Sequence, residues 1–285
     1  MLNRGAICNA RISGARAKEP TPVAVFDLAA CLALIDNLTA IAARAAAAIR
    51  QSRREALRLK ADGSPVTAAD EAAEAVICEG LRGLAPGVPI VSEEEAPSGK
   101  AGPPADRSAS YFLVDPLDGT REFIAGRNEF TVNIALVTAG APILGIIAAP
   151  AYDLTWRGIV GYGADRFERG GKTPTAIHTR ARPHKPVVMV SRSHLDPNTR
   201  AYLDALPQKV TETYGSSIKF CRIAEGAADL YPRLGPTHDW DVAAGHAILG
   251  AAGGAVTAPD GSPLIYGARD LLISHFVATG DPRMT

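Results

Sequence analysis

Two aspartates, Asp115 and Asp118, stand three positions apart in the segment VDPLDGT, directly after the apolar run 111–114. Ligand sites are commonly found where such a strand ends. Two carboxylates held this close repel each other, which raises the free-energy cost of ionising both. A divalent cation removes that cost, and Mg²⁺ prefers oxygen ligands, with water and substrate phosphate completing its octahedron. The aspartate pair therefore indicates a magnesium site.

The next two residues, Gly119 and Thr120, suit phosphate. If a helix begins there, its first backbone N–H groups point outward and carry partial positive charge, which favours a bound anion. Glycine lets a phosphate approach the backbone, and threonine adds a hydroxyl. The segment as a whole indicates a phosphate held beside metal ions.

Further acids stand at the edges of other apolar or helical runs. Asp70 falls in the first turn of a predicted helix, three glutamates (93–95) follow a short apolar run, and Asp239 and Asp241 open another helix. Taken singly, each has an ordinary explanation, because acids favour the first turn of a helix and glutamate runs are usually solvated. Four separate segments that each place acids at such an edge are, taken together, harder to explain by these ordinary roles.

Apolar periodicity and punctuation residues predict the elements that must position these acids. Thr67 is a plausible N-cap, Gly80 a stop signal for the helix it opens, and Pro116 the end of a strand. The predicted helices cover 27–51, 67–79, 198–206 and 239–254. The predicted strands cover 88–95, 111–114, a hairpin over 130–150, further strands over 154–167, and 186–191, 264–266 and 275–278.

The bulk composition narrows the class of protein. The chain has 285 residues with 30 basic and 30 acidic side chains, so zero formal charge gives no reason to expect nucleic-acid binding. No apolar stretch was expected to reach the roughly 18 residues that a membrane span needs. We predict a flexible leader (1–20), an N-terminal α+β metal-binding domain (21–180) and a C-terminal α/β substrate domain (181–285).

The segments KADGSPVTAAD, VSEEE, VDPLDGTREFIAGRNEFTVNIALV and DWDVAAGHAIL, taken in order, resemble the lithium-sensitive, Mg²⁺-dependent inositol monophosphatase superfamily. VVMVSRSH, GSSIKFC and DLYPRLGPTHDWD are most similar to its bacterial 3'(2'),5'-bisphosphate nucleotidases. The resemblance implies a layered αβαβα sugar-phosphatase fold, with two sheets sandwiched between helix layers. It also implies two or three Mg²⁺ ions and hydrolysis of the 3'-phosphate of adenosine 3',5'-bisphosphate.

The resemblance also assigns roles to individual residues. Asp70 and the hydroxyl of Thr120 would hold and deprotonate the attacking water, and the amides of Gly119 and Thr120 would bind the scissile phosphate. The metal ligands would be Glu93, Asp115, the carbonyl of Leu117, Asp118 and Asp241. The residues lining the nucleotide and its 5'-phosphate would be His194, Ser216, Lys219 and Arg233.

Several questions stay open at this point. The alternative substrates within the superfamily are inositol-1-phosphate, histidinol phosphate and fructose 1,6-bisphosphate, and 3'-phosphoadenosine 5'-phosphosulfate is a further candidate. A metal- or nucleotide-binding protein without catalysis is a third reading. The expected partner is a small nucleotide, in a monomer or a dimer. The absence of CxxC pairs favours free thiols and a cytoplasmic location, and peripheral association with the inner membrane face is left open.

Overall fold

The computed structural model describes most of the chain, and the statements below concern those residues. The predicted leader lies outside them, as does the start of the KADGSPVTAAD turn. The described ranges are 26–52, 57–59, 65–96, 102–168 and 173–282.

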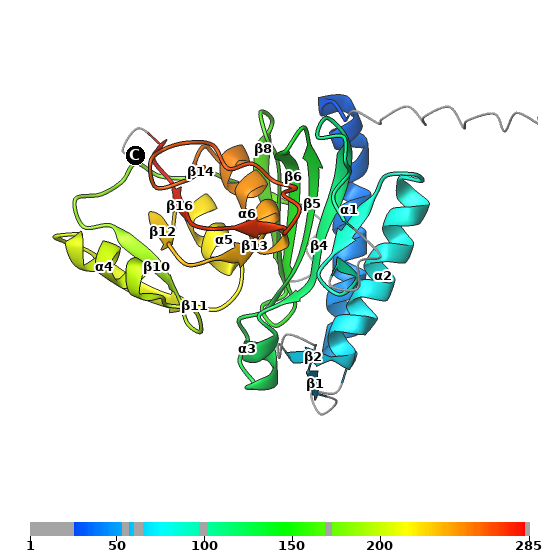
Figure 1. Cartoon of the computed structure of the whole chain (residues 1–285), viewed down its shortest axis with the longest axis horizontal. Helices are drawn as coiled ribbons and strands as arrows, with labels where there is room; N and C mark the ends of the chain where they lie inside the picture. The colour runs from blue at the N-terminus through cyan, green and yellow to red at the C-terminus, as the bar shows by residue number, and fades with distance from the viewer. Residues whose placement is uncertain (1–25, 53–56, 60–64, 97–101, 169–172, 283–285) are drawn as a thin grey trace, which may run out of the picture.

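The elements stack in five layers (Figure 1). Helices α1 (Leu28–Gln51) and α2 (Ala68–Leu84) cover one face of a seven-stranded sheet. Helices α5 (Ile218–Ala224) and α6 (Asp239–Ala251) lie between that sheet and a five-stranded one, and α4 (Pro197–Ala205) covers the far side. The predicted αβαβα architecture is confirmed.

The seven-stranded sheet carries Asp115 and Asp118 on one of its strands. Its strand order follows the chain, with the first pair parallel and the others antiparallel. The predicted hairpin over 130–150 is confirmed. The strands are β3 (Ile90–Ser92), β4 (Ser110–Asp118), β5 (Thr131–Thr138), β6 (Ala141–Ala149), β7 (Leu154–Ile159), β8 (Gly163–Glu168) and β9 (Thr175–Ile177).

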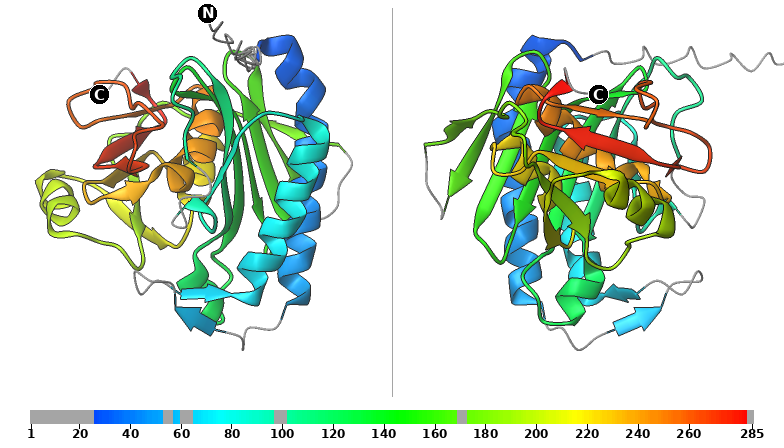
Figure 2. Two further views of the ribbon diagram at one scale, coloured as in Figure 1. Left: turned by 45° about the vertical axis from the view of Figure 1, so that its right-hand side comes forward. Right: turned by 90° about the vertical axis from the view of Figure 1, so that its left-hand side faces the viewer.

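Helix α1 begins within one residue of the prediction, and Asp27 caps it by accepting from the backbone N–H of Ala30. By length and composition it could cross a membrane, although the sequence analysis found no apolar stretch long enough. In the fold, however, Leu34, Leu38 and Ile41 are buried with α2 and the first sheet. One face of the helix therefore packs in the core, and Figure 2 shows the helix, in blue, beside the first sheet.

Helix α2 confirms Thr67 as its N-cap but passes through Gly80 and ends at Leu84. The predicted stop was wrong because Gly80 has another purpose. A Cβ on Gly80 would lie 2.8 Å from Cγ1 of Ile41, so this glycine lets α1 and α2 approach closely. Leu81 continues the buried face beyond it.

Strand β4 continues to Asp118, so the prediction that Pro116 ends it was also wrong. Asp115 pairs with Asn133 and Asp118 with Thr131, which leaves one extra residue on β4. A bulge of this kind accommodates a proline, which has no N–H for the ladder. The side chain of Asp115 accepts from the N–H of Leu117 at 3.0 Å and stabilises the turn of the chain.

The middle layer joins the two sheets. Helix α6 is apolar on most of its surface because it is covered on both sides, and its buried residues share a core with strands of both sheets. Its approach to β6 is close, since a Cβ on Gly145 would lie 2.3 Å from the carbonyl oxygen of Ala244. Asp241 is therefore held at a fixed place above the first sheet.

The five-stranded sheet has the order β11-β10-β12-β16-β14, and α4 packs on its outer face. The predicted strand over 264–266 is absent, with only an isolated bridge between Thr257 and Pro263, and strands over 255–257 and 272–273 were not predicted. The domain boundaries stay a prediction. The remaining strands are β1 (Leu57–Leu59), β2 (Pro65–Thr67), β10 (Val187–Ser191), β11 (Val210–Tyr214), β12 (Leu230–Arg233), β13 (Thr237–His238), β14 (Ala255–Thr257), β15 (Leu272–Ile273) and β16 (Phe276–Thr279).

Candidate active site

A cavity of about 370 Å³ lies between the first sheet and the C-terminal half of the chain. Asp70 is not part of its lining, but it contacts the lining residue Thr120. Asp239, Glu94 and Glu95 do not line it either. The other residues to which the resemblance assigned roles do line it: Glu93, Asp115, Leu117, Asp118, Gly119, Thr120, His194, Ser216, Lys219, Arg233 and Asp241. Their roles remain predictions, but the fold brings them to one place.

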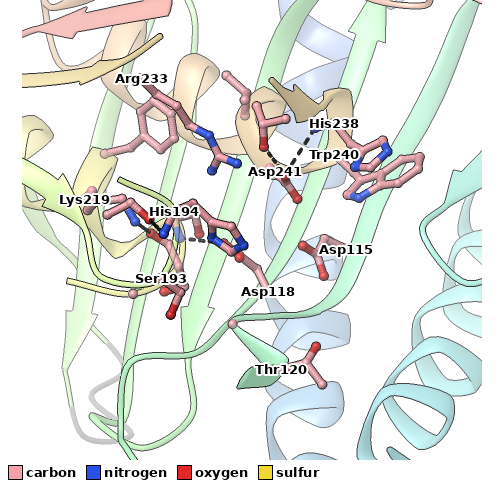
Figure 3. A pocket seen from close by; sticks show the side chains of 18 of the residues that line it. Asp115, Asp118, Thr120, Ser193, His194, Lys219, Arg233, His238, Trp240 and Asp241 are labelled. Atoms are coloured by element: carbon pink, nitrogen blue, oxygen red, sulfur yellow. Dashed lines mark hydrogen bonds between the residues drawn. The ribbon is translucent and has the colours of Figure 1, made fainter. Parts of the chain in front are cut away.

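Three acids form the centre of the cavity. Asp115, Asp118 and Asp241 can each offer an oxygen such that these atoms all lie within 4.8 Å of one another. Figure 3 shows the three side chains directed into the same space, from β4 and from the start of α6. Glu93 directly follows β3 and lies close enough to Asp115 for its charge to raise the pKa of Asp115.

Burial and mutual repulsion perturb these carboxylates strongly. Burial raises the pKa of Asp115 well above its usual range, and the charges of Glu93, Asp118 and Asp241 raise it further. Burial and the charge of Asp241 raise the pKa of Asp118 to about 7, although the charge of Lys219 opposes the rise. These acids lie too close together for all of them to ionise without a counter-charge. A bound cation would supply that charge and stabilise the site. The all-oxygen donor set fits Mg²⁺.

Asp70 and Thr120 form a hydrogen-bonded pair beside the acid cluster. Thr120 Oγ1 lies 3.2 Å from Asp70 Oδ1 and 3.0 Å from the carbonyl oxygen of Leu117. The other carboxylate oxygen of Asp70 accepts from the backbone N–H and the hydroxyl of Thr67 at 2.7 and 2.6 Å. Burial raises the pKa of Asp70, and these hydrogen bonds hold it down in part. The capping box of α2 therefore fixes the orientation of a carboxylate that can accept a proton.

Four helices begin at this site. Asp70 and Asp241 are the third residues of α2 and α6, and Gly119 caps the short helix α3 (Thr120–Ile124). Ser217, the residue before α5, donates its backbone N–H to Asp118 at 2.6 Å. The expected helix start at Thr120 is confirmed, and Gly119 takes φ of +89°, which suits glycine. The helix starts add partial positive charge around the acids.

The predicted substrate residues occupy the facing side. Figure 3 shows Arg233 and His194 across the cavity from Asp115. Burial, together with the charges of Arg233 and Arg121, lowers the pKa of His194, so its imidazole is neutral at pH 7. Ser216 has φ of +51°, a strained value for serine, and it lies against Gly119, which with Thr120 forms the predicted phosphate cradle.

Lys219 lies deeper than a residue that meets only substrate. Its ammonium donates to the carbonyl oxygen of Tyr214 at 3.3 Å and to that of Ser216, and it lies 5.0 Å from the ring centre of Tyr231. Its charge also lowers the pKa of Asp118. In this structure Lys219 therefore acts on the protein and on the acid cluster, and contact with substrate stays a prediction.

Sequence reasoning missed several aromatic residues in the lining, and two of them lie beside Asp241. His238 and Trp240 flank Asp239, and their rings stack with centroids 4.5 Å apart and planes 9° apart. Trp240 is buried and His238 is exposed, so the stacked rings extend from the core to the surface beside Asp241. Their proximity to Asp241 in the segment THDWD was the signal that could have indicated them.

Comparisons with known proteins agree with the geometry. The sequence profile of the inositol monophosphatase family matches residues 32–283. A 3'(2'),5'-bisphosphate nucleotidase CysQ of Escherichia coli K12 is 48% identical over 215 residues, which cover 75% of this chain and 85% of that protein. The nucleotidase CysQ of Haemophilus influenzae is 34% identical over 232 residues, with 79% and 84% covered.

Solved structures give the same assignment. CysQ from Bacteroides thetaiotaomicron, described as a bacterial member of the inositol monophosphatase family, superposes with a TM-score of 0.70 at 33% identity, covering 88% of this chain and 97% of that one. An inositol monophosphatase from Anabaena gives a TM-score of 0.70 at 29% identity, covering 88% and 92%. The expected superfamily is confirmed: this chain belongs to the inositol monophosphatase family.

Proposed function

We propose that this protein is a Mg²⁺-dependent 3'(2'),5'-bisphosphate nucleotidase, which releases the 3'-phosphate of adenosine 3',5'-bisphosphate to give AMP. One observation carries the proposal: in one cavity the acid cluster, which would hold metal ions, lies opposite Arg233, which suits a second phosphate (Figure 3). The name and the 48% identity of the E. coli relative support the same substrate class. The related compound 3'-phosphoadenosine 5'-phosphosulfate is a further candidate substrate.

The metal ligands would be Glu93, Asp115, Asp118, Asp241 and the carbonyl of Leu117. Two or three bound Mg²⁺ ions would supply charge that neutralises the phosphate and makes water more acidic. The protein's own contribution is placement, because the ligands come from β3, β4 and α6, and each strand or helix is fixed in the core.

Thr120 and Asp70 are the groups that move a proton. With its hydroxyl directed to Asp70 at 3.2 Å, Thr120 keeps a lone pair for the hydrogen of an attacking water. The water's proton passes to the hydroxyl oxygen while the hydroxyl's own proton passes to Asp70 Oδ1. The raised pKa of Asp70 helps it to accept that proton near neutral pH. The N–H groups of Gly119 and Thr120, at the start of α3, hold the phosphate.

On the facing side, Arg233 would bind the 5'-phosphate. Its Nη2 donates to the carbonyl oxygen of Pro236 at 3.1 Å, which orients the guanidinium and leaves other N–H groups for an anion. His194 and Ser216 would contact the nucleoside. A cytoplasmic location is part of the proposal, since Cys31, Cys78 and Cys221 are all free and buried.

The test is phosphate release from adenosine 3',5'-bisphosphate, inositol-1-phosphate, histidinol phosphate and fructose 1,6-bisphosphate, with Mg²⁺ and with EDTA. The nucleotide should give the highest kcat/KM, and only with Mg²⁺. R233A should lower kcat/KM for the bisphosphate by roughly tenfold to a hundredfold, as expected for a lost charge-assisted contact, and leave inositol-1-phosphate nearly unchanged. R200A, at an exposed arginine of α4, is the matched control. A preference for inositol-1-phosphate would refute the nucleotidase and favour an inositol phosphatase.

A further inference from the structure

Arg192 stands two positions before the predicted substrate residue His194. It is absent from the residues that line the cavity, whereas Ser191, Ser193 and His194 line it. Its guanidinium instead binds Glu129 in a fork, with Nε to Oε2 at 2.8 Å and Nη2 to Oε1 at 2.7 Å. Bidentate pairs of this kind fix orientation as well as distance. Arg192 therefore supports the cavity wall from outside the lining.

Glu129 is shared between both sides of the site. Its carboxylate also accepts the backbone N–H of Gly215 at 2.7 Å, and Gly215 precedes Ser216 of the cavity wall. Its own carbonyl oxygen is packed against two glycines, because a Cβ on Gly119 or on Gly215 would lie 2.8 Å from it. Glu129 thus contacts Gly119 of the phosphate cradle through its backbone, and it holds the residue before Ser216 through its carboxylate.

Arg192 adds two further contacts. Its Nη2 donates to the carbonyl oxygen of Thr213 at 2.9 Å. Its backbone N–H donates to the carbonyl oxygen of Tyr214 at 3.1 Å. Next to it, Ser193 donates to the buried carboxylate of Glu122 in α3 at 2.5 Å. The end of β10 is therefore tied to both the 213–215 segment and the α3 region.

The charges of the pair suit this role. The side chains are 32% and 15% exposed, so the pair is partly shielded from water. Burial alone would raise the pKa of Glu129, but hydrogen bonds from Arg192 and from the N–H of Gly215 lower it overall. The carboxylate thus stays ionised at neutral pH and keeps its donors.

We propose that Arg192 and Glu129 form a clasp that positions His194 and Ser216 relative to the phosphate cradle, and thereby favours two-ended bisphosphate substrates over small monophosphates. Both are positioning residues, since neither lines the cavity. The inference rests on the proposed nucleotidase function. Neither residue of the clasp would touch the second phosphate. The clasp would act instead by holding the backbone of segments 192–194 and 213–216 in place.

The test compares R192A, E129A and the double variant on adenosine 3',5'-bisphosphate and on p-nitrophenyl phosphate. R192A should raise KM for the bisphosphate by about fivefold, the effect of a strong partly exposed ion pair, with kcat and the p-nitrophenyl phosphate constants little changed. The double variant should come close to E129A, because the ion pair is already lost there and the second substitution removes only the contact of Arg192 with Thr213. R192K should restore part of the affinity.

R180A is the matched control, because Arg180 makes a similar fork to Asp229 at 2.7 and 2.8 Å, with neither residue in the lining. It should lower stability without changing KM. Hydrogen exchange of the 213–217 amides gives a readout that needs no substrate: R192A should exchange there faster, and R180A should not. Unchanged exchange, additive KM effects, or equal losses on both substrates would overturn the clasp. If the wild type fails on the bisphosphate, the proposed function fails, and the exchange data still decide the clasp.

Discussion

Replacing Asp118 by asparagine should abolish activity and yet stabilise the metal-free protein. The carboxylate has a folded pKa of about 7 against a usual value of 3.8, because burial and the charge of Asp241 disfavour ionisation. Roughly three pKa units correspond to about 4 kcal/mol at 1.36 kcal/mol per unit. That is the largest gain expected in free energy of unfolding, and asparagine keeps an oxygen to accept from Ser217.

The stability of the metal-free protein should depend on pH through the ionisation of Asp118. Below about pH 4 the carboxyl is protonated in both the folded and the unfolded chain, so the penalty is absent. Between about pH 4 and 7 the folded chain binds more protons than the unfolded one, so stability falls as pH rises, and the penalty is complete above pH 7. D118N lacks this term and should lose less stability over the same range.

The assay is urea unfolding in EDTA at pH 4.5 and pH 8. The variant should exceed the wild type by roughly 2–4 kcal/mol at pH 8 and by much less at pH 4.5. D204N, at an exposed acid of α4, is the control and should match the wild type. Adding Mg²⁺ should stabilise the wild type and leave D118N nearly unaffected, because a ligand that binds only the folded state stabilises it. A variant less stable than the wild type at pH 8 in EDTA would refute the electrostatic argument.

Three further outcomes are expected. D70N should lower kcat by roughly 10²–10⁴-fold with KM nearly unchanged, as loss of a general base does; steady-state kinetics that show normal kcat would remove Asp70 from the mechanism. G245A should cost about 1–3 kcal/mol in urea unfolding, because its Cβ would lie 2.4 Å from the ring of Phe220. G250A, where the nearest atom is 3.7 Å away, is the control, and equal effects would contradict the packing argument. Millimolar Li⁺ should inhibit phosphate release and be relieved by Mg²⁺; insensitivity would count against a family-type metal site.

The sequence allowed the acid cluster to be predicted because its signals are local. Asp115 and Asp118 share one turn, Asp70 follows a recognisable N-cap, and Asp241 opens a helix, so pattern and spacing were sufficient. The hairpin over 130–150 followed for the same reason, since its two strands, β5 and β6, are joined by a short connection. The convergence of the acids, however, was inferred from the family resemblance.

The rest depended on tertiary packing. Gly80 reads as a helix stop in the sequence, but Ile41 of another helix decides its purpose. Lys219 reads as a cation for substrate, yet its ammonium is directed to backbone carbonyls that only the folded chain brings near. Short strands such as 255–257 carry too few residues for a pattern, and their partner β16 lies about twenty residues further along the chain.

The four helix starts around the acids have a consequence for the order of ligand binding. The carboxylates of Asp118 and Asp70 already accept from N–H groups at two of these helix starts. In the proposed function the carboxylates would attract a metal cation, and the start of α3 would attract the phosphate anion. Ion and substrate should each tighten the retention of the other, and release of phosphate should loosen the hold on the metal.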